Sequence, residues 1–257
     1  MYHGATPPLA ASTALATWAL AAATFFAIGT ALGGGLAASS AAQVIGLVVV
    51  PIAVLRVHGV GIDAASLGLA RPRARAVAGA ALAGACTWYV TLRVALPIVA
   101  ATGRDAEVRE FTRAVTGDGA PWVLAASALA PGFCEELLHR GVILPALARR
   151  AGRGVGLAAV TALFAVMHIE PARIATAALI GLAAGSLTLW TRSLWPAVTL
   201  HIINNVAALL VGSGHLPGAT HLLTSHPDAA LAFAIAGTLC GLALAAIPPK
   251  PARPRGG

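Results

Sequence analysis

Apolar runs of about 20 residues recur along the whole chain, and they restrict its fold more than any other feature. A helix needs about 20 apolar residues to cross about 30 Å of hydrocarbon. Inside a bilayer the backbone must satisfy its own hydrogen bonds, so an all-α, polytopic membrane protein with about eight transmembrane helices in one bundle is predicted. The predicted spans, with boundaries accurate to about three residues, are 9–32, 36–56, 77–101, 121–147, 154–169, 172–190, 194–212 and 228–247.

The composition agrees with that prediction. Of the 257 residues, 58% are hydrophobic and 10% are charged, whereas soluble domains have about 25% charged residues. No repeat of solenoid length is visible, so residues 1–247 are expected to form a single integral membrane domain with its motifs in 120–210. Residues 248–257 are rich in proline and arginine and are expected to be a disordered cytoplasmic tail. The three cysteines lie in apolar runs and are expected to be buried hydrophobic residues.

The net charge of +8 follows from where the basic residues lie between the predicted spans. If both termini are cytoplasmic, the opposite segments contain four basic residues and the cytoplasmic segments contain eleven, namely Arg56, Arg71, Arg73, Arg75, Arg149, Arg150, Arg153, Arg192, Lys250, Arg253 and Arg255. Membrane proteins concentrate lysine and arginine on the cytoplasmic side. We therefore expect a multi-pass protein of the cell (inner or plasma) membrane with cytoplasmic N- and C-termini. Anionic lipid accounts for the basic charge, and no nucleic-acid partner is expected.

Four ionisable residues lie in the fourth predicted span, where a charge costs about 2.5–3.5 kcal/mol on insertion scales. Residues four apart share a helix face, so Glu136 and Arg140 can form an ion pair. Glu135 points about 100° away and faces His139 instead. The helix thus offers an internal ion pair and a free carboxylate. The alternative is that all four groups only neutralise one another where helices pack.

Further polar residues lie in other predicted spans. His168 follows Phe164 in the fifth span, and His201 and Asn205 share one face of the seventh. With a rise of 1.5 Å per residue, Glu135 lies roughly 18 Å, His168 roughly 18–21 Å and His201 to Asn205 roughly 10–17 Å from the cytoplasmic ends of their helices. These groups are therefore predicted to converge near the membrane midplane. A single histidine in a span is more often a hydrogen-bonded packing residue, and that interpretation stays open for each one.

Two chemistries use such a cluster. Glu135, His168 and His201 are the ligand set of a catalytic zinc or another divalent metal, with water in the open position. Without metal, a carboxylate and an imidazole can deprotonate water while an imidazole N–H and a carboxamide N–H stabilise an oxyanion. Both schemes lead to amide hydrolysis. Elsewhere, Arg93 in the third span can pair with a glutamate of the cluster or extend to the interface.

The ordered set of motifs resembles the CPBP family of intramembrane proteases. The motifs are Glu135-Glu136-x-x-x-Arg140, Phe164-x-x-x-His168 and His201-x-x-x-Asn205, each on a separate span. The segment Thr191 to His201 resembles the run that leads into the third motif, and Leu67-Gly-Leu resembles the cytoplasmic loop of that family. The resemblance covers about residues 120–210, and the first three spans are similar only in character. The family includes type II CAAX prenyl proteases and bacteriocin-processing or immunity proteins.

The resemblance implies an eight-helix membrane endopeptidase that acts on a membrane-associated protein or peptide. By that resemblance, Glu135 activates water with the help of His168, and His201 and Asn205 stabilise the oxyanion. Alternatively, the two histidines bind a metal ion. Glu136, Arg140, His139 and Phe164 would support the site. His139 stands where the family usually has an aromatic residue, so it is either an added ligand or proton relay, or a substitution that faces a neighbouring helix.

Two other classes of function remain as alternatives. One is a non-catalytic membrane scaffold or immunity factor. The other is a proton-coupled transporter, because buried Glu, His and Arg clusters also serve as proton relays. The transporter interpretation is weaker, because the sequence shows neither inverted repeats nor paired broken helices.

Overall fold

A computed structural model describes residues 9–103, 125–212 and 214–248. Within these ranges the chain is helical and has no strand, which confirms the predicted all-α class. The start of the fourth predicted span and the predicted tail after Pro248 lie outside the described residues. By length and composition, six helical stretches of the described chain can cross a membrane. The chain is therefore a multi-pass membrane protein.

The helices follow the predicted spans closely. Their bounds are α1 Ala11–Ala31, α2 Gly35–Val44, η1 Ile45–Val49, α3 Val50–Val57, α4 Ala74–Thr102, η2 Ala125–Leu129, α7 Ala130–Glu136, η3 Leu137–Ile143, α8 Leu144–Ala151, α9 Arg153–Val166, α10 Pro171–Thr191, α11 Trp195–Gly212, α12 Pro217–Ser225 and α13 Pro227–Ala246. The π-helical stretches η1, η2 and η3 continue directly into their α-helical neighbours. The predicted number of about eight spans is not established, because α9 has only 14 residues and a spanning helix needs about 20.

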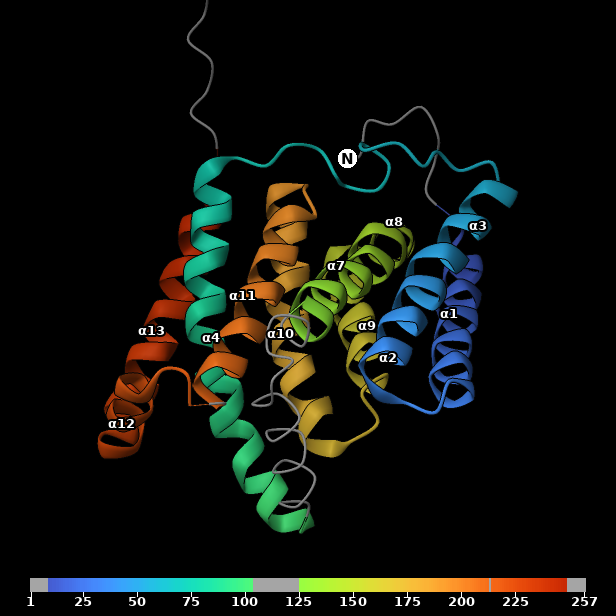
Figure 1. The fold of residues 1–257 in the computed structure, drawn as a ribbon. Coiled ribbons are helices and arrows are strands. Elements are labelled where there is room, and N and C mark those ends of the chain that lie inside the picture. Colours follow the sequence, from blue (N-terminus) through green and yellow to red (C-terminus); the bar gives the residue numbers. More distant parts are fainter. Residues whose placement is uncertain (1–8, 104–124, 213, 249–257) are drawn as a thin grey trace, which may run out of the picture.

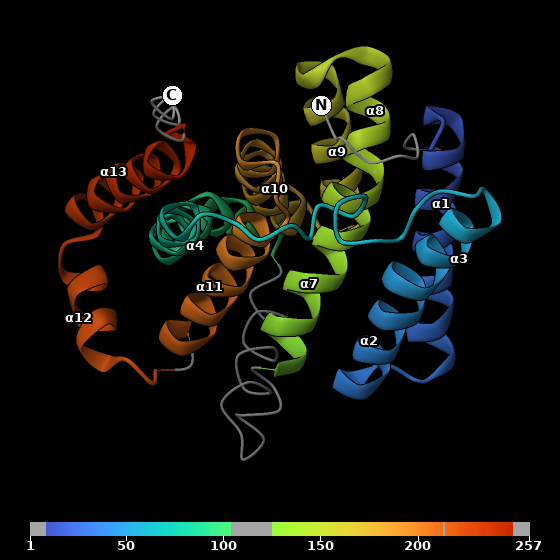
Figure 2. The same ribbon diagram turned by 90° about the horizontal axis from the view of Figure 1, so that it is seen from above.

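The helices form three groups, which Figure 1 and Figure 2 show from two directions. Helices α1, α2 and α3 lie on one side, and α4, α12 and α13 lie on the other. Between them stand α11, α10, α9 and the continuous helix from η2 to α8. Gly79 of α4 and Gly241 of α13 allow close packing of these two helices, because a Cβ added at either glycine would lie 2.5 Å from the carbonyl oxygen of the other. Small residues permit such close approach of membrane helices.

Three segments that were predicted to be cytoplasmic meet at one end of the bundle, at the top of Figure 1. The loop after α3 binds the start of α11, where the Leu194 N–H donates to the Gly68 carbonyl at 2.7 Å and the Ser193 hydroxyl to the Ala70 carbonyl at 2.9 Å. Arg73 of this loop donates to the carbonyl of Ile247 after α13 at 3.0 Å, and Arg75 at the start of α4 donates to the same carbonyl at 2.7 Å. This end of the molecule, which we call the basic end, therefore joins the loop 58–73 to the ends of α11 and α13.

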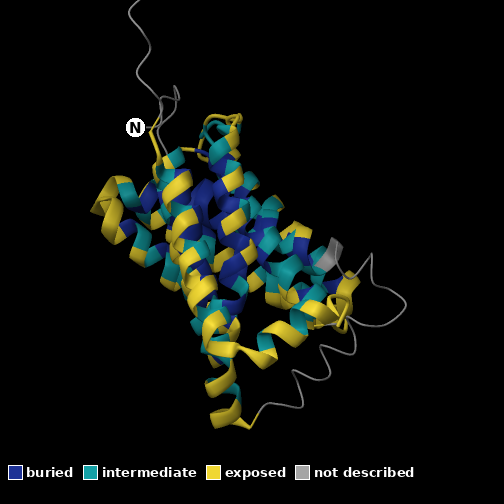
Figure 3. Cartoon of the chain, turned by 90° about the vertical axis from the view of Figure 1, so that its left-hand side faces the viewer, coloured by how far each residue is buried: buried dark blue, intermediate teal, exposed yellow. Residues whose placement is uncertain are grey.

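The buried residues lie in the interior of the bundle and the exposed residues lie on its outside, as Figure 3 shows. Large apolar side chains such as Phe233 and Leu239 are 77% and 60% exposed, as expected for helices whose outer faces contact lipid. The prediction for the cysteines is partly wrong, because Cys86 and Cys134 are buried but Cys240 is exposed. Cys240 lies on α13, which packs on the bundle through one face only.

Candidate active site

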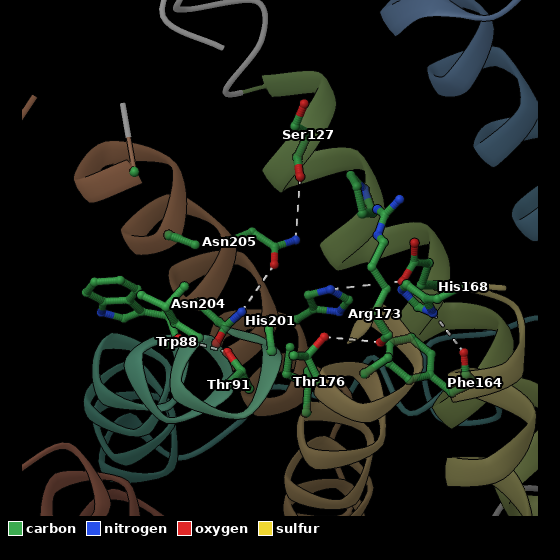
Figure 4. A pocket seen from close by; sticks show the side chains of 18 of the residues that line it. Trp88, Thr91, Ser127, Phe164, His168, Arg173, Thr176, His201, Asn204 and Asn205 are labelled. Carbon is green, nitrogen blue, oxygen red and sulfur yellow. Dashed lines mark hydrogen bonds and ion pairs between the residues drawn. The ribbon is translucent and has the colours of Figure 1, made fainter. Parts of the chain in front are cut away.

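A cavity of about 1480 Å³ lies between α2, α4, α7, α10 and α11. The predicted catalytic residues Glu135, His168, His201 and Asn205 line it together with His139 and Phe164, whereas Glu136 and Arg140 do not. Figure 4 shows His168, His201 and Asn205 with Phe164 around this space. They come from the end of α9 and from the middle of α11. Side chains that are distant in the sequence therefore face one cavity, as the depth estimate predicted.

Glu136 is the centre of a sealed polar cluster. Its Oε1 accepts a hydrogen bond from Arg140 Nη1 at 3.1 Å, which confirms the predicted pair. The same oxygen accepts from His201 Nδ1 at 2.9 Å. The Glu136 and Arg140 side chains are 0% exposed. A buried ion pair needs such additional hydrogen bonds to offset its desolvation, and His201 supplies one of them.

Arg140 is held on three sides. Its guanidinium lies 4.5 Å from the centre of the Phe164 ring, and its Nη2 donates to the Gly181 carbonyl at 2.9 Å. A Cβ at position 181 would approach Arg140 Nη2 to 3.3 Å and the Phe164 ring to 3.1 Å. Gly181 and Gly185 form a Gly-x-x-x-Gly pattern on α10, and such patterns let membrane helices pack closely. The structure shows that the missing side chain of Gly181 also makes room for Arg140.

Glu135 has different surroundings from its neighbour. Its side chain is 15% exposed, and the distance from its Oε2 to His201 Nε2 is 4.0 Å. That distance is too long for a hydrogen bond. Oε2 has no hydrogen-bond partner among the described residues. Oε2 of Glu136 likewise has no partner among the described residues, but of the two adjacent glutamates only Glu135 lines the cavity.

His201 and His168 each have one ring nitrogen fixed by the protein. A carboxylate can only accept hydrogen bonds, so His201 Nδ1, which bonds Glu136, must carry the hydrogen. The carbonyl of Phe164 lies 3.0 Å from His168 Nδ1, which must likewise be the donor. The Phe164 ring contacts both imidazoles, with centroid separations of 5.1 Å to His168 and 5.8 Å to His201. Each Nε2 is left for the cavity or for Glu135.

His139 is fully buried, and both of its ring nitrogens are used. Nδ1 lies 2.8 Å from the backbone carbonyl of Glu135, and Nε2 accepts from Trp18 Nε1 of α1 at 3.2 Å. The predicted contact with Glu135 is therefore made to its backbone and not to its carboxylate. With both nitrogens engaged, the ring has none left for a metal or for proton transfer. His139 faces a neighbouring helix, which was one of the two interpretations of this residue.

Asn205 belongs to a short chain of carboxamides. Its Nδ2 lies 3.5 Å from the Ser127 carbonyl, and its Oδ1 accepts from Asn204 Nδ2 at 3.3 Å. Asn204 is 4% exposed, and its own Oδ1 has no partner among the described residues. Figure 4 shows the three residues in a row. Asn204 was missed by the sequence analysis, although its spacing of three from His201 places it on the same helix face.

The metal interpretation finds no closed site in the described part of the chain. There, no three His, Cys, Asp or Glu side chains are grouped as a metal ion requires. Arg93 lines the cavity, but it does not pair with the cluster. Its Nη2 pairs with Asp228 at 3.2 Å and its Nη1 donates to the Pro227 carbonyl at 2.9 Å. The alternative in which Arg93 pairs with a glutamate of the cluster is therefore wrong.

A protein-family model described as type II CAAX prenyl endopeptidase Rce1-like matches residues 117–207. This segment contains all three motifs that carry the resemblance to CPBP proteases. The resemblance is confirmed over these residues. The match leaves out α1 to α4, α12 and α13, so it covers the cluster but only some of the helices around it. Comparison with curated proteins and with solved structures gave no match.

Proposed function

We propose that the chain is an intramembrane endopeptidase that hydrolyses a peptide bond in a membrane-associated protein or peptide. One observation carries the proposal. Two adjacent glutamates are divided between two tasks, since Glu136 is fully buried and bound by Arg140 and His201 while Glu135 is 15% exposed and lines the cavity. The family match supports this assignment, because its model describes an endopeptidase.

Glu135 is assigned as the general base. Its carboxylate takes a proton from a water molecule while the water oxygen attacks the carbonyl carbon of the peptide bond. His168 assists, because its Nδ1–H is occupied by the Phe164 carbonyl and its Nε2 lone pair can hold the same water. General-base catalysis of this kind contributes about 10²–10⁴-fold to a rate.

Asn205 and His201 are assigned to the oxyanion. The Asn205 carboxamide has two N–H groups, and one that is not used by Ser127 can donate to the developing charge. His201 is oriented by its Nδ1 bond to Glu136 and, when doubly protonated, donates through Nε2. The tetrahedral intermediate collapses when the C–N bond breaks and Glu135 returns its proton to the leaving nitrogen. The products are a new carboxyl group and a new amine.

The same reaction could also depend on a metal ion, and the experiments must distinguish this mechanism from the metal-free one. Glu135, His168 and His201 would hold zinc or another divalent ion, which would lower the pKa of a bound water to about 7.

Hydrolysis by the purified protein tests the proposal. We would incubate the wild type, Glu135→Ala and His168→Ala in detergent with a library of quenched peptides. His58→Ala is the matched control, because His58 is exposed at the basic end, away from the cavity. The wild type and His58→Ala are expected to cleave, and the other two variants are expected to lose about 10²-fold or more.

Equal cleavage by all four proteins would refute the assignment. Absence of cleavage together with an intact cellular phenotype for Glu135→Ala would favour the scaffold or immunity alternative. Chelator treatment and metal re-addition separate the two forms of the reaction, since only the metal-dependent form loses and regains activity. Elemental analysis of the purified protein by inductively coupled plasma provides the independent measurement.

A further inference from the structure

The cavity occupies one half of the bundle, and that half is the one away from the basic end. On α4, which begins at Ala74 near the basic end, the lining residues start only at Trp88. On α11, which begins at Trp195, they run from His201 to Gly212. On α10, which runs in the opposite direction, they lie in the first half, from Arg173 to Ile180. Helices of both directions thus place the cavity in the same half.

The rim of the cavity lies at that far end. Leu36 at the start of α2, Leu96 near the end of α4 and Ile169 after α9 all line it and are 40%, 51% and 67% exposed. Deeper lining residues such as Phe164 and His201 are buried. In Figure 1 the rim helices end at the bottom, opposite the loop 58–73. The described part of the chain therefore leaves the cavity open at the end that is distant from the basic loops.

Most basic residues lie at the end of the bundle that is opposite the cavity. Eight basic residues of the described chain lie at the basic end, where the helices α3, α4, α8, α9 and α10 begin or end: Arg56, Arg71, Arg73, Arg75, Arg149, Arg150, Arg153 and Arg192. In the cavity half the described chain has Arg93 and Arg173, and Arg93 is paired with Asp228. The positive-inside rule assigns the end that is richer in arginine to the cytoplasm.

We infer that the cavity opens on the extracytoplasmic face of the membrane. Its substrate is then a polypeptide that reaches the enzyme from that side, either an exported chain or the outer part of a membrane-spanning segment. The statement about the substrate rests on the proposed function. The side of the membrane on which the cavity opens does not depend on whether the protein is catalytic. A cytoplasmic protein with a modified C-terminus would approach the wrong end of the bundle.

The walls favour an apolar segment. Phe25, Phe26, Leu47 and Leu92 line the cavity from α1, η1 and α4, so apolar side chains of a substrate would replace lipid contacts with protein contacts. Among the polar lining groups, Glu135, His168, His201 and Asn205 form the proposed site. An extended apolar peptide can therefore lie along the walls while one of its peptide bonds meets the polar group.

Cysteine labelling tests the sidedness without any reference to activity. In a Cys240→Ala background, which removes the exposed native thiol, we would introduce Leu36→Cys or Ile169→Cys at the rim. Val57→Cys, 83% exposed at the end of α3, is the matched control at the basic end. A membrane-impermeant maleimide is applied to intact spheroplasts and to inverted vesicles. We expect rim labelling in spheroplasts and Val57→Cys labelling in inverted vesicles, each at least about tenfold above the background protein.

The reverse pattern, or labelling of the rim in neither preparation, overturns the inference. A second measurement uses the unmodified protein, so it does not depend on the folding of any variant. A membrane-impermeant quenched peptide is offered to spheroplasts and to inverted vesicles, with Glu135→Gln as the inactive reference. Cleavage by spheroplasts alone supports the inference, and cleavage by inverted vesicles alone contradicts it. If no cleavage occurs even in detergent, the proposed function fails while the labelling still decides the sidedness.

Discussion

Glu135 and Glu136 are neighbours in the sequence, but they belong to two different regions of the molecule. The region around Glu136 is sealed, with Arg140 and His201 bonded to one carboxylate oxygen and no exposure of the pair. The region around Glu135 is the wall of an open cavity. The difference shows how a membrane helix can carry a structural and a chemical group on successive residues. A turn of about 100° per residue is enough to direct them to different surroundings.

Substitution of one glutamate at a time tests this division most directly. We expect Glu135→Gln to lower kcat/KM by about 10²–10⁴-fold without lowering the midpoint of thermal denaturation in detergent. Glu136→Gln should instead lower the denaturation midpoint, because Arg140 would remain buried without a counter-ion, at a cost of about 3–5 kcal/mol. Hydrolysis of a quenched peptide and circular dichroism during heating measure the two effects. A stability loss for Glu135→Gln as large as that for Glu136→Gln would show that the two regions are not separate.

Removal of the other member of the sealed pair sharpens the comparison. Arg140→Met leaves the Glu136 carboxylate buried with only His201 as donor, and a loss of about 3–5 kcal/mol is expected. Replacing Glu136 and Arg140 together by Met should cost less than Arg140→Met alone, since no unpaired charge remains. Thermal denaturation of the single and double variants provides the comparison. A double variant that is less stable than Arg140→Met would mean that the pair stabilises the fold beyond neutralising its own charges.

The sequence predicted those features that depend on residues close together along the chain. Apolar length predicted the helices, and a spacing of four predicted the Glu136–Arg140 pair. Features that depend on how helices rotate against each other were not predictable. The bond from His201 to Glu136 joins residues 65 positions apart, and the ion pair of Arg93 with Asp228 joins residues 135 apart. The spacing of residues along the chain does not predict either of these contacts.

His139 shows the same limit within the motif. Its spacing predicted a contact with Glu135, and the contact exists, but the sequence does not distinguish a backbone carbonyl from a carboxylate. The ring turns toward α1 because Trp18 supplies a donor there, and nothing in the motif refers to α1. Asn204 was missed for a related reason. Adjacent asparagines look interchangeable until burial shows which of them is enclosed.

The carboxamides of the open region allow a smaller and more selective test. Asn205→Ala should lower kcat by about 10²–10³-fold, as removal of an oxyanion donor does. Asn204→Ala should lower kcat by about tenfold with little change in KM, because the Asn204 N–H fixes the orientation of the Asn205 carboxamide. In the Asn205→Ala background the Asn204 substitution should have no further effect on kcat. An equal loss in both backgrounds would show that Asn204 acts on the fold and not through Asn205.

Trp18 is linked to the backbone of Glu135 through the ring of His139. Its substitution should have the smallest effect on activity and stability. Trp18→Phe removes the N–H that His139 Nε2 accepts, and an unsatisfied buried acceptor costs about 1–3 kcal/mol. Activity should fall less than tenfold, because the Glu135 carboxylate itself is not touched. The double variant Trp18→Phe/His139→Phe removes both polar partners, which can be nearly neutral, so it should denature at a higher temperature than Trp18→Phe alone. If the double variant is instead the less stable one while its activity collapses, then the hydrogen bond from His139 to the Glu135 carbonyl positions the catalytic helix, and the separation of the two regions depends on α1.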